Sequence, residues 1–255
     1  MKRAIVNVAT TEHYRKGQQR LTEAARKQGY NTFQWGTEPT GCPSHAAVPY
    51  AMKAFALKET EELGWDLLLW CDSCMLPVQS LEPLWQRIER DGYWMSRNGY
   101  TNYEWTADQA YPDLFESLFY SRGLTWEEKM QTARDVNRKI PHVVATCFGL
   151  NVKHVLGKAF LDEYYRLASE TPAFCGPWTN RAYAESQGQA QIGGKPHVDY
   201  CGPHDVRGHR HDQTAASVIA WSLGFQLTDP PEIFAYGKAG EPHDPRTLLI
   251  ADGSY

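Results

Sequence analysis

The hydrophobic and polar positions of the chain alternate between short apolar runs and longer amphipathic stretches. Residues 4–9 form the first apolar run, and its exit, residues 10–13, is polar. Residues 18–27 then suit a helix that ends at Gly29, and residues 31–35 suit a second short strand. A strand, a helix and a second strand in this order predict a βαβ unit.

A second apolar run, residues 67–70, is short and almost uninterrupted, as expected of a parallel strand that is buried on both faces. It ends abruptly at Asp72, Ser73 and Cys74, and Pro77 follows. In an open α/β sheet, ligands bind outside the carboxyl ends of the strands. An acid at position 72 is therefore better placed to meet a ligand than an acid on a helix surface.

The rest of the pattern predicts one domain in which strands and helices alternate. Helices are predicted at 50–63, 80–90, 125–138, 152–167 and 214–223, and strands at 93–96 and 143–150. Thr125 and Glu128 have the spacing of a capping box, and Asp212 is the predicted N-cap of the last helix. Residues 97–112 and 172–208 are predicted loops, and the tail from 228 onward is predicted to wrap the surface.

Composition narrows the class of protein. The chain has 255 residues, 42% of them hydrophobic and 22% charged, which is typical of an ordinary globular protein with a substantial core. No apolar run approaches the roughly 20 residues of a membrane span, and the start lacks the apolar region of a signal peptide, so a cytoplasmic protein is expected. A net charge of -4 argues against a strongly electrostatic, non-specific nucleic-acid binder.

Six cysteines are too sparse for a disulfide scaffold, so reduced thiols are expected. Cys71 and Cys74 nevertheless have the CxxC spacing of a thiol-disulfide site. A thioredoxin-like fold is much shorter than this chain, and residues 77–80 leave the thiols in a loop instead of opening a helix. A third interpretation is that Asp72 only caps a turn and both thiols are buried packing.

The second informative stretch is residues 208–217, GHRHDQTAAS. His209, His211, Asp212 and Gln213 lie at a predicted helix start, where backbone N–H groups and the helix dipole favour an anion. Histidines at alternate positions lie on one side of an extended segment, so they could complete a metal site with Asp72. The alternative is that Asp212 is only an N-cap and the histidines are solvated.

Four short motifs occur together in this chain: Val48-Pro49-Tyr50-Ala51-Met52-Lys53, Leu69-Trp70-Cys71-Asp72-Ser73, Thr146-Cys147-Phe148-Gly149-Leu150-Asn151 and His209-Arg210-His211-Asp212-Gln213-Thr214. The combination resembles nucleotide-sugar glycosyltransferase-like proteins of the GT-A fold. Such proteins often carry a Pro-Tyr-x-x-Lys helix, a Trp-x-Asp-Ser strand end and a His-Asp-Gln-Ser/Thr helix start. The resemblance touches the chain from about residue 4 to residue 224.

This resemblance implies a fold and an activity. The fold would be α/β, with a mixed, mostly parallel, Rossmann-like sheet flanked by helices. Residues 1–97 would form a nucleotide-sugar-binding half and residues 98–255 an acceptor-binding half of one catalytic domain. The activity would be transfer of a hexosyl or pentosyl group from a UDP- or GDP-sugar to an acceptor hydroxyl, on a glycan or on a hydroxylated base in DNA.

The resemblance also implies donor contacts for five residues. Thr10 and Thr11 would contact the base or ribose, and Lys53 would approach the donor or its phosphates. Asp72 and Ser73 would meet the donor at the strand end. A solvated helix lysine is the ordinary alternative for Lys53.

For the reacting centre, the resemblance implies that Asp72 holds a metal ion or the donor ribose, and that His209 or His211 supplies a late metal or phosphate contact. Asp212 and Gln213 would face the acceptor or the reacting sugar. Asp212 is the candidate for a general base or for stabilising an oxocarbenium-like charge.

The acceptor is expected at five residues: Arg97, Tyr100, Tyr103, Trp105 and Trp178. Aromatic rings stack on a sugar as readily as on a base, so these residues do not distinguish the two acceptors. The alternative is that the loop at 97–112 packs its own aromatics.

One departure from the family pattern concerns the metal. Cys74 stands where the family usually has a second acid, so one strong carboxylate ligand for a hard cation is missing. The chain would then bind Mn²⁺ or Mg²⁺ weakly, or work without a metal, with Lys and Arg neutralising the diphosphate. Two other functions stay open: a CxxC dithiol oxidoreductase and a non-catalytic carbohydrate-binding protein.

Overall fold

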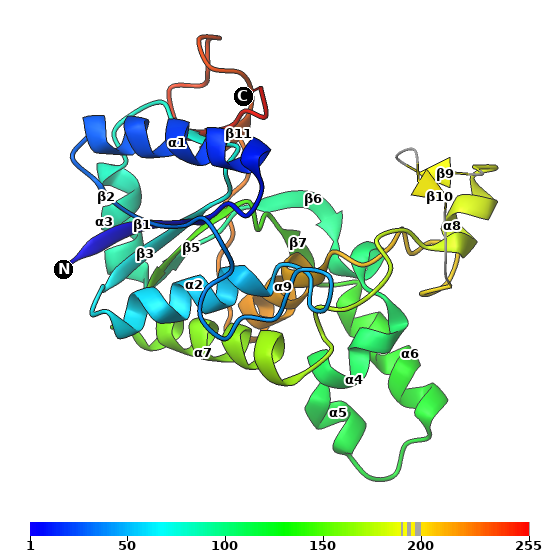
Figure 1. Cartoon of the computed structure of the whole chain (residues 1–255). Coiled ribbons are helices and arrows are strands. Elements are labelled where there is room, and N and C mark those ends of the chain that lie inside the picture. Colours follow the sequence, from blue (N-terminus) through cyan, green and yellow to red (C-terminus); the bar gives the residue numbers. More distant parts are fainter. Residues whose placement is uncertain (190, 193–194, 197–199, 255) are drawn as a thin grey trace.

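A five-stranded sheet with the order β2-β1-β3-β8-β5 forms the centre of the molecule (Figure 1). The computed structural model describes residues 1–189, 191–192, 195–196 and 200–254. The five strands are β1 (Arg3–Val8), β2 (Asn31–Trp35), β3 (Leu67–Cys71), β5 (Tyr93–Trp94) and β8 (Cys147–Asn151). β1 pairs in parallel with β2 and β3, whereas β8 pairs antiparallel with β3 and β5. Only β8 opposes the other four, which confirms the predicted mixed, mostly parallel sheet.

The side chains of β3 alternate between two hydrophobic cores. Leu68 and Trp70 pack with residues of α2 (Ala51–Glu62) and α7 (Val155–Glu170). The alternate residues of the strand face the opposite core. The N–H of Asp72 still donates to the Thr146 carbonyl at 2.8 Å, so the strand pairing continues past Cys71. Since two residues separate Asp72 from Trp70, the alternation directs its side chain to the α2 side.

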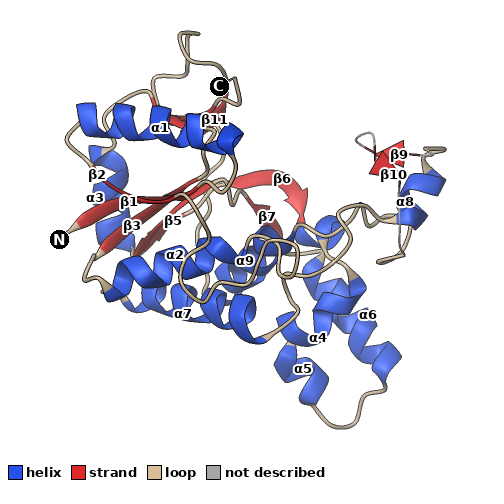
Figure 2. Ribbon diagram, in the orientation of Figure 1, coloured by secondary structure: helices blue, strands red, loops and turns tan. Residues whose placement is uncertain are grey.

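Helices cover both faces of this sheet (Figure 2). α2 and α7 lie on one face, while α1 (Glu12–Lys27) and α3 (Glu82–Asp91) lie on the other. Thr11 caps α1 by accepting a hydrogen bond from the N–H of Tyr14. The predicted α/β fold, with helices flanking the sheet, is therefore confirmed, and both halves of the chain build it because β8 lies between β3 and β5.

Two segments predicted as loop or surface wrapping contain strands. Residues 97–112 contain β6 (Arg97–Thr101), the 3-10 helices η1 (Asn102–Trp105) and η2 (Asp108–Ala110) and the start of α4 (Tyr111–Leu114), and β6 pairs with β7 (Pro141–Val143). In the tail, β11 (Ile233–Tyr236) and β12 (Thr247–Ala251) form a second sheet with β4 (Met75–Pro77). The loop predictions were wrong because partners distant in sequence supply these pairings.

The last long helix begins earlier than predicted. α9 spans His211–Ser222 and its N-cap is Arg210, so Asp212 lies in the first turn and does not cap the helix. Asp212 is therefore free of the capping role that the sequence predicted for it. α7 packs against both α2 and α9, and α9 packs against β7.

The remaining helices lie to one side of the sheet, on the right in Figure 1. They are α5 (Glu116–Tyr120) and α6 (Trp126–Asn137), which follow α4, and the separate short helix α8 (Arg181–Ser186), beside the two-residue strands β9 (Gln191–Ile192) and β10 (Lys195–Pro196). The predicted capping box of α6 is confirmed, with the N–H of Glu128 donating to Thr125 at 3.2 Å and the N–H of Thr125 donating to Glu128 at 2.8 Å.

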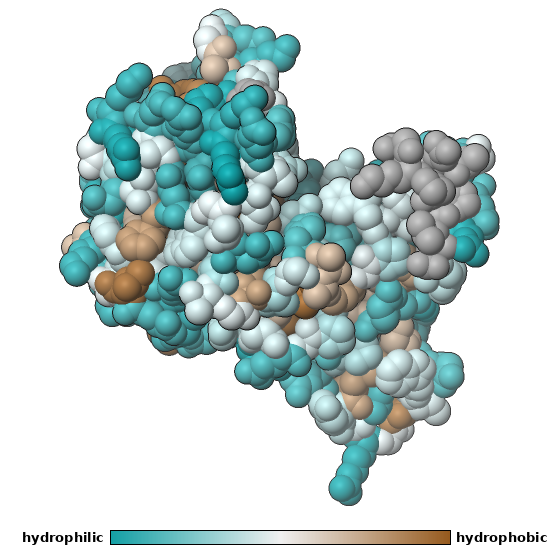
Figure 3. Space-filling model, in the orientation of Figure 1, coloured by the Kyte–Doolittle hydropathy of each residue, from teal (hydrophilic) through white to brown (hydrophobic). Residues whose placement is uncertain are grey.

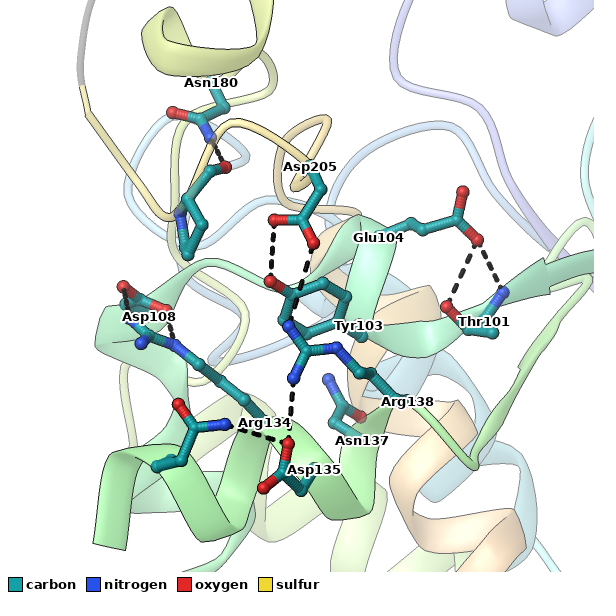
Figure 4. A network of polar contacts seen from close by, with 12 residues as sticks. Thr101, Tyr103, Glu104, Asp108, Arg134, Asp135, Asn137, Arg138, Asn180 and Asp205 are labelled. Atoms are coloured by element: carbon teal, nitrogen blue, oxygen red, sulfur yellow. Dashed lines mark hydrogen bonds and ion pairs between the residues drawn. The ribbon is translucent and has the colours of Figure 1, made fainter. Parts of the chain in front are cut away.

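α6 is tied to the rest of the chain by charged side chains. Figure 4 shows Arg138 between Asp135 and Asp205, and the hydroxyl of Tyr103 donating to Asp205. Arg134 pairs with Asp108 beside them. Every one of these arginines has a carboxylate partner, which becomes relevant below.

The space-filling view shows a largely hydrophilic face with scattered apolar residues (Figure 3). A notch lies at the top of this face, between the part that carries α1 and the part that carries α8. None of the helices in the described part of the chain is long and apolar enough to cross a membrane.

Candidate functional site

The ammonium group of Lys53 lies between two carboxylates. Its Nζ is 3.1 Å from Oδ1 of Asp72 and 3.0 Å from Oδ2 of Asp212. It also donates to the carbonyl of Ala145 at 2.8 Å. The three donors of the ammonium group are thus all used, and the Lys53 side chain is only 4% exposed.

Three separate elements bring these charges together. Lys53 comes from the first turn of α2, Asp72 follows β3 directly, and Asp212 lies in the first turn of α9. β1 and β3 are parallel, so Thr10 after β1 and Asp72 after β3 leave the sheet at the same edge. This is the edge at which open α/β sheets bind ligands. The structure therefore joins three residues that the sequence singled out separately.

Burial and charge act against each other in this group. Burial lowers the pKa of Lys53, but Asp212 and Asp72 more than offset it, and the net pKa is raised. Burial raises the pKa of Asp72 and of Asp212, and the charge of Lys53 opposes that rise. Lys53 therefore stays protonated. Its single positive charge pairs with two acids whose pKa values are higher than those of exposed acids.

The two acids differ in access to solvent. The side chain of Asp72 is 32% exposed, whereas that of Asp212 is 6% exposed. Oδ1 of Asp72 also accepts from the Trp70 indole N–H at 2.8 Å, and Oδ2 of Asp212 accepts from the Tyr164 hydroxyl at 3.4 Å. Among the described residues, no donor is bonded to the second oxygen of Asp72. Asp72 is thus the acid with an oxygen available to a ligand.

His209 is held by backbone groups on both ring nitrogens. Its Nδ1 accepts from the Ala107 N–H at 3.2 Å, and its Nε2 donates to the Ala173 carbonyl at 3.0 Å. Burial lowers its pKa to about 3, so the ring is neutral and leaves no lone pair for a metal ion. The expectation that His209 ligates a metal is therefore wrong, because both nitrogens serve the loop.

His211 has one nitrogen left. Its Nδ1 donates to the Phe174 carbonyl at 2.9 Å, which puts the lone pair on Nε2. Burial lowers its pKa to about 4. Across the described ranges, no group of three or more His, Cys, Asp or Glu side chains is arranged to hold a metal ion. A complete protein cage for a metal ion, with Asp72, His209 and His211, is thus not formed there.

The other predicted donor and catalytic residues have mainly structural contacts. Thr11 is the N-cap of α1, and Thr10 beside it is half-buried. Ser73 is 5% exposed and accepts from the Asn7 side chain at 3.4 Å. Gln213 donates to the backbone carbonyl of Val143 and so attaches α9 to β7.

The predicted acceptor residues separate into two groups. Tyr100 and Trp105 are in edge contact, with ring centroids 5.7 Å apart, and Trp178 is half exposed. Arg97 instead forms a two-point ion pair with Asp229 on the surface, and Tyr103 is buried under Arg138. Arg97 and Tyr103 are thus already occupied within the protein.

Sequence reasoning missed the two arginines that connect these rings. The guanidinium carbon of Arg210 lies 3.8 Å from the ring centroid of Trp105 and 3.7 Å from that of Trp178. Arg207 lies 4.8 Å from the ring centroid of Tyr100 and 5.5 Å from that of Trp105. Arg210 belongs to a quoted motif, but nothing in the sequence indicated which rings would enclose it.

Tyr50 and His211 were also not recognised as neighbours. Their ring centroids are 5.6 Å apart, and His211 stacks on Trp178 at 5.8 Å. Both have positive φ, 62° for Tyr50 and 48° for His211, which is uncommon for residues other than glycine. Backbone strain of this kind concentrates at functional sites. These rings connect the lysine group to the arginines.

The cysteines do not form a redox centre. Cys71 and Cys74 form no disulfide, and their thiols face apolar surroundings. Burial raises the pKa of Cys74 to about 12 and that of Cys71 well above its ordinary value. Since the thiolate is the reactive species, both thiols are inert near neutral pH. This chemistry does not support the dithiol oxidoreductase hypothesis.

The solved structures to which the chain is similar over nearly its whole length include two glycosyltransferases. A glycosyltransferase involved in the glycosylation of the major capsid of PBCV-1 is 12% identical with a TM-score of 0.47, covering 98% of this chain and 92% of that chain. The apo form of mouse xyloside xylosyltransferase 1 is 7% identical with a TM-score of 0.47, covering 100% and 98%. No protein-family model and no curated protein matches the chain. These matches identify neither a donor nor an acceptor for this chain.

Proposed function

We propose that the protein transfers a sugar from a nucleotide-sugar donor to an acceptor hydroxyl. The observation that carries this proposal is the group of Lys53, Asp72 and Asp212 at the carboxyl edge of the parallel strands, with an oxygen of Asp72 left for a ligand. A buried lysine paired with two acids of raised pKa is typical of a catalytic site. The donor is a UDP- or GDP-linked hexose or pentose, as the motif resemblance implies.

In this proposal Asp72 faces the donor and Asp212 serves the acceptor. The acceptor oxygen forms a bond to the anomeric carbon while the bond from that carbon to the diphosphate breaks. The leaving nucleoside diphosphate takes the bonding electrons, and the acceptor proton passes to a carboxylate. Burial raises the pKa of Asp212, which suits it to receive that proton. Lys53 stays charged and limits the negative charge of the site.

In this proposal a divalent cation would have few ligands from the protein. The free oxygen of Asp72 and Nε2 of His211 are the two atoms that would contact Mn²⁺ or Mg²⁺. Mg²⁺ often takes one or two carboxylates and fills its shell with substrate phosphates and water. Such an ion would supply charge neutralisation to the leaving diphosphate, and Cys74, half-buried and protonated, would take no part.

For the acceptor we propose a hydroxyl held beside Tyr100 and Trp178, which are 40% and 50% exposed. Their rings suit a glycan or a hydroxylated base in DNA. Competition between an oligosaccharide and a hydroxymethylated oligonucleotide as acceptors distinguishes the two.

The donor test is thermal stability against UDP, GDP and their sugars, each with Mn²⁺ and again with EDTA. A ligand that binds the native state raises the melting temperature by linkage. We therefore expect one class of nucleotide, UDP-linked or GDP-linked, to raise the melting temperature selectively. Loss of that rise in EDTA would place a cation in the donor site. If no nucleotide raised the melting temperature under either condition, the proposed function would be wrong.

A further inference from the structure

Arg210 is enclosed by two indole rings. Its guanidinium carbon is 3.8 Å from the ring centroid of Trp105 and 3.7 Å from that of Trp178, so a ring covers each face of the guanidinium. One terminal nitrogen donates to the Trp178 carbonyl at 2.8 Å. The stacking immobilises the side chain and leaves the N–H groups along its edge as the only part that can meet a ligand.

No carboxylate among the described residues pairs with Arg210. Within the described part of the chain, its neighbour Arg207 pairs with one acid, Glu104, at 3.4 Å, and its side chain is 33% exposed. Arg138 provides the contrast, because it also lies over a ring, that of Tyr103 at 3.9 Å, yet it pairs with Asp135 at 2.9 Å and Asp205 at 3.7 Å (Figure 4). Stacking on an aromatic ring therefore does not require an arginine without an acid.

The positive charge of Arg210 costs stability where it lies. Burial, with a smaller contribution from the like charge of Arg207, lowers its pKa to about 10. Ring faces and carbonyl groups offset part of the cost of burying a charge, and an acid would offset more. An anion placed against the edges of both guanidinium groups would relieve their repulsion as well as the burial cost.

We propose that Arg210 and Arg207 form an oxyanion site that binds a phosphate group of a substrate. Arg210 is also the N-cap of α9, a helix of 12 residues, and the helix dipole favours an anion at that end. Guanidinium groups bind phosphate oxygens through paired N–H donors, which lysine cannot reproduce. The phosphate belongs either to the nucleotide donor or to a phosphorylated acceptor. Phosphate binding by these arginines does not rest on the proposed transfer reaction.

The direct test is calorimetric titration of the intact protein with inorganic phosphate and with pyrophosphate. Arg210→Gln is expected to weaken binding about tenfold or more, because a charge-assisted hydrogen bond to the anion is lost. Arg210→Lys is expected to recover only part of the affinity. Arg138→Gln is the matched control and should bind like the unaltered protein. Circular dichroism without phosphate verifies that each variant is folded.

Two further ligands identify the source of the phosphate. If it belongs to the donor, Arg210→Gln weakens binding of UDP or GDP as well as of pyrophosphate. If it belongs to the acceptor, the same variant weakens binding of a sugar phosphate and leaves the nucleotides unchanged. Both results support the oxyanion site.

The site is refuted if neither phosphate nor pyrophosphate binds, or if folded Arg210→Gln binds them as well as the unaltered protein. Equal losses in Arg210→Gln and Arg138→Gln would also overturn it, since they would reflect net charge alone. Phosphate binding that depends on Arg210, in a protein that binds no nucleotide sugar, would refute only the proposed transfer reaction.

Discussion

Lys53 and Arg210 are two shielded cations whose charges are compensated in opposite ways. Lys53 has two carboxylates and a carbonyl within 3.1 Å. Arg210 has two ring faces and backbone carbonyls, with no acid among the described residues. The charge of Lys53 is balanced by two acids of the protein, whereas the charge of Arg210 remains available to a ligand. In the two proposed sites, Lys53 therefore balances the charge of the acids, and Arg210 contacts the ligand.

The largest effect that would break this comparison is removal of the lysine charge. Lys53→Met leaves two acids in a low-dielectric site without a counter-charge, so unfolding free energy should fall by about 3 to 5 kcal/mol. Urea unfolding measures the change. Lys58→Met is the control on the same helix, where the pair with Glu61 lies nearer the surface, and its loss should stay within about 1 kcal/mol. Equal losses would show that Lys53 is not a special buried cation.

The two acids should affect turnover more than folding. Asp72→Asn and Asp212→Asn are each expected to lower the transfer rate by about 100-fold or more, because one loses a donor contact and the other a proton acceptor. Asp162→Asn, at an exposed lysine pair, is the control and should keep its rate. Initial rates with the donor identified by thermal stability test this. Near-normal rates in both site variants, with the fold intact, would rule out the assigned site.

A smaller effect is expected in the pH dependence of stability. The pKa values of Asp72 and Asp212 are raised from 3.8, so the native state binds more protons than the unfolded state just above that value. Their contribution to stability therefore falls as pH rises from 3.8 to the raised pKa values, by about 1.4 kcal/mol for each unit of rise. Lys53 stays charged throughout this window. The free energy of unfolding is measured against pH for the unaltered protein and for the double variant Asp72→Asn, Asp212→Asn. The two curves should differ in slope within this pH window, and parallel curves would contradict the assignment.

The smallest expected effect concerns the arginine side of the comparison. Trp178→Ala removes one ring from Arg210 and should lower unfolding free energy by about 0.5 to 2 kcal/mol. It should also weaken phosphate binding less than Arg210→Gln does, because the charge remains. Calorimetry measures both variants. Tighter phosphate binding in Trp178→Ala would show that the ring competes with the anion instead of presenting the guanidinium.

Part of the fold could be predicted because it depends on neighbouring residues. The apolar run at 67–70 indicated β3, and Thr125 with Glu128 indicated the start of α6. β6, β11 and β12 gave no such signal, since their pairing partners lie elsewhere in the chain. The predicted N-cap of α9 was misplaced by two residues: the N-cap is Arg210, and Asp212 lies in the first turn, where it pairs with Lys53.

The sequence by itself determined which residue types stand at strand ends and helix starts, and this was enough to single out Lys53, Asp72 and Asp212. Only the tertiary structure decided that one ammonium group joins the two acids, that His209 is consumed by backbone contacts, and that Arg210 lies between two indole rings. The reason is physical. Local patterns depend on residues that are neighbours in the chain, whereas burial, pKa and charge compensation depend on atoms that folding brings together from distant segments.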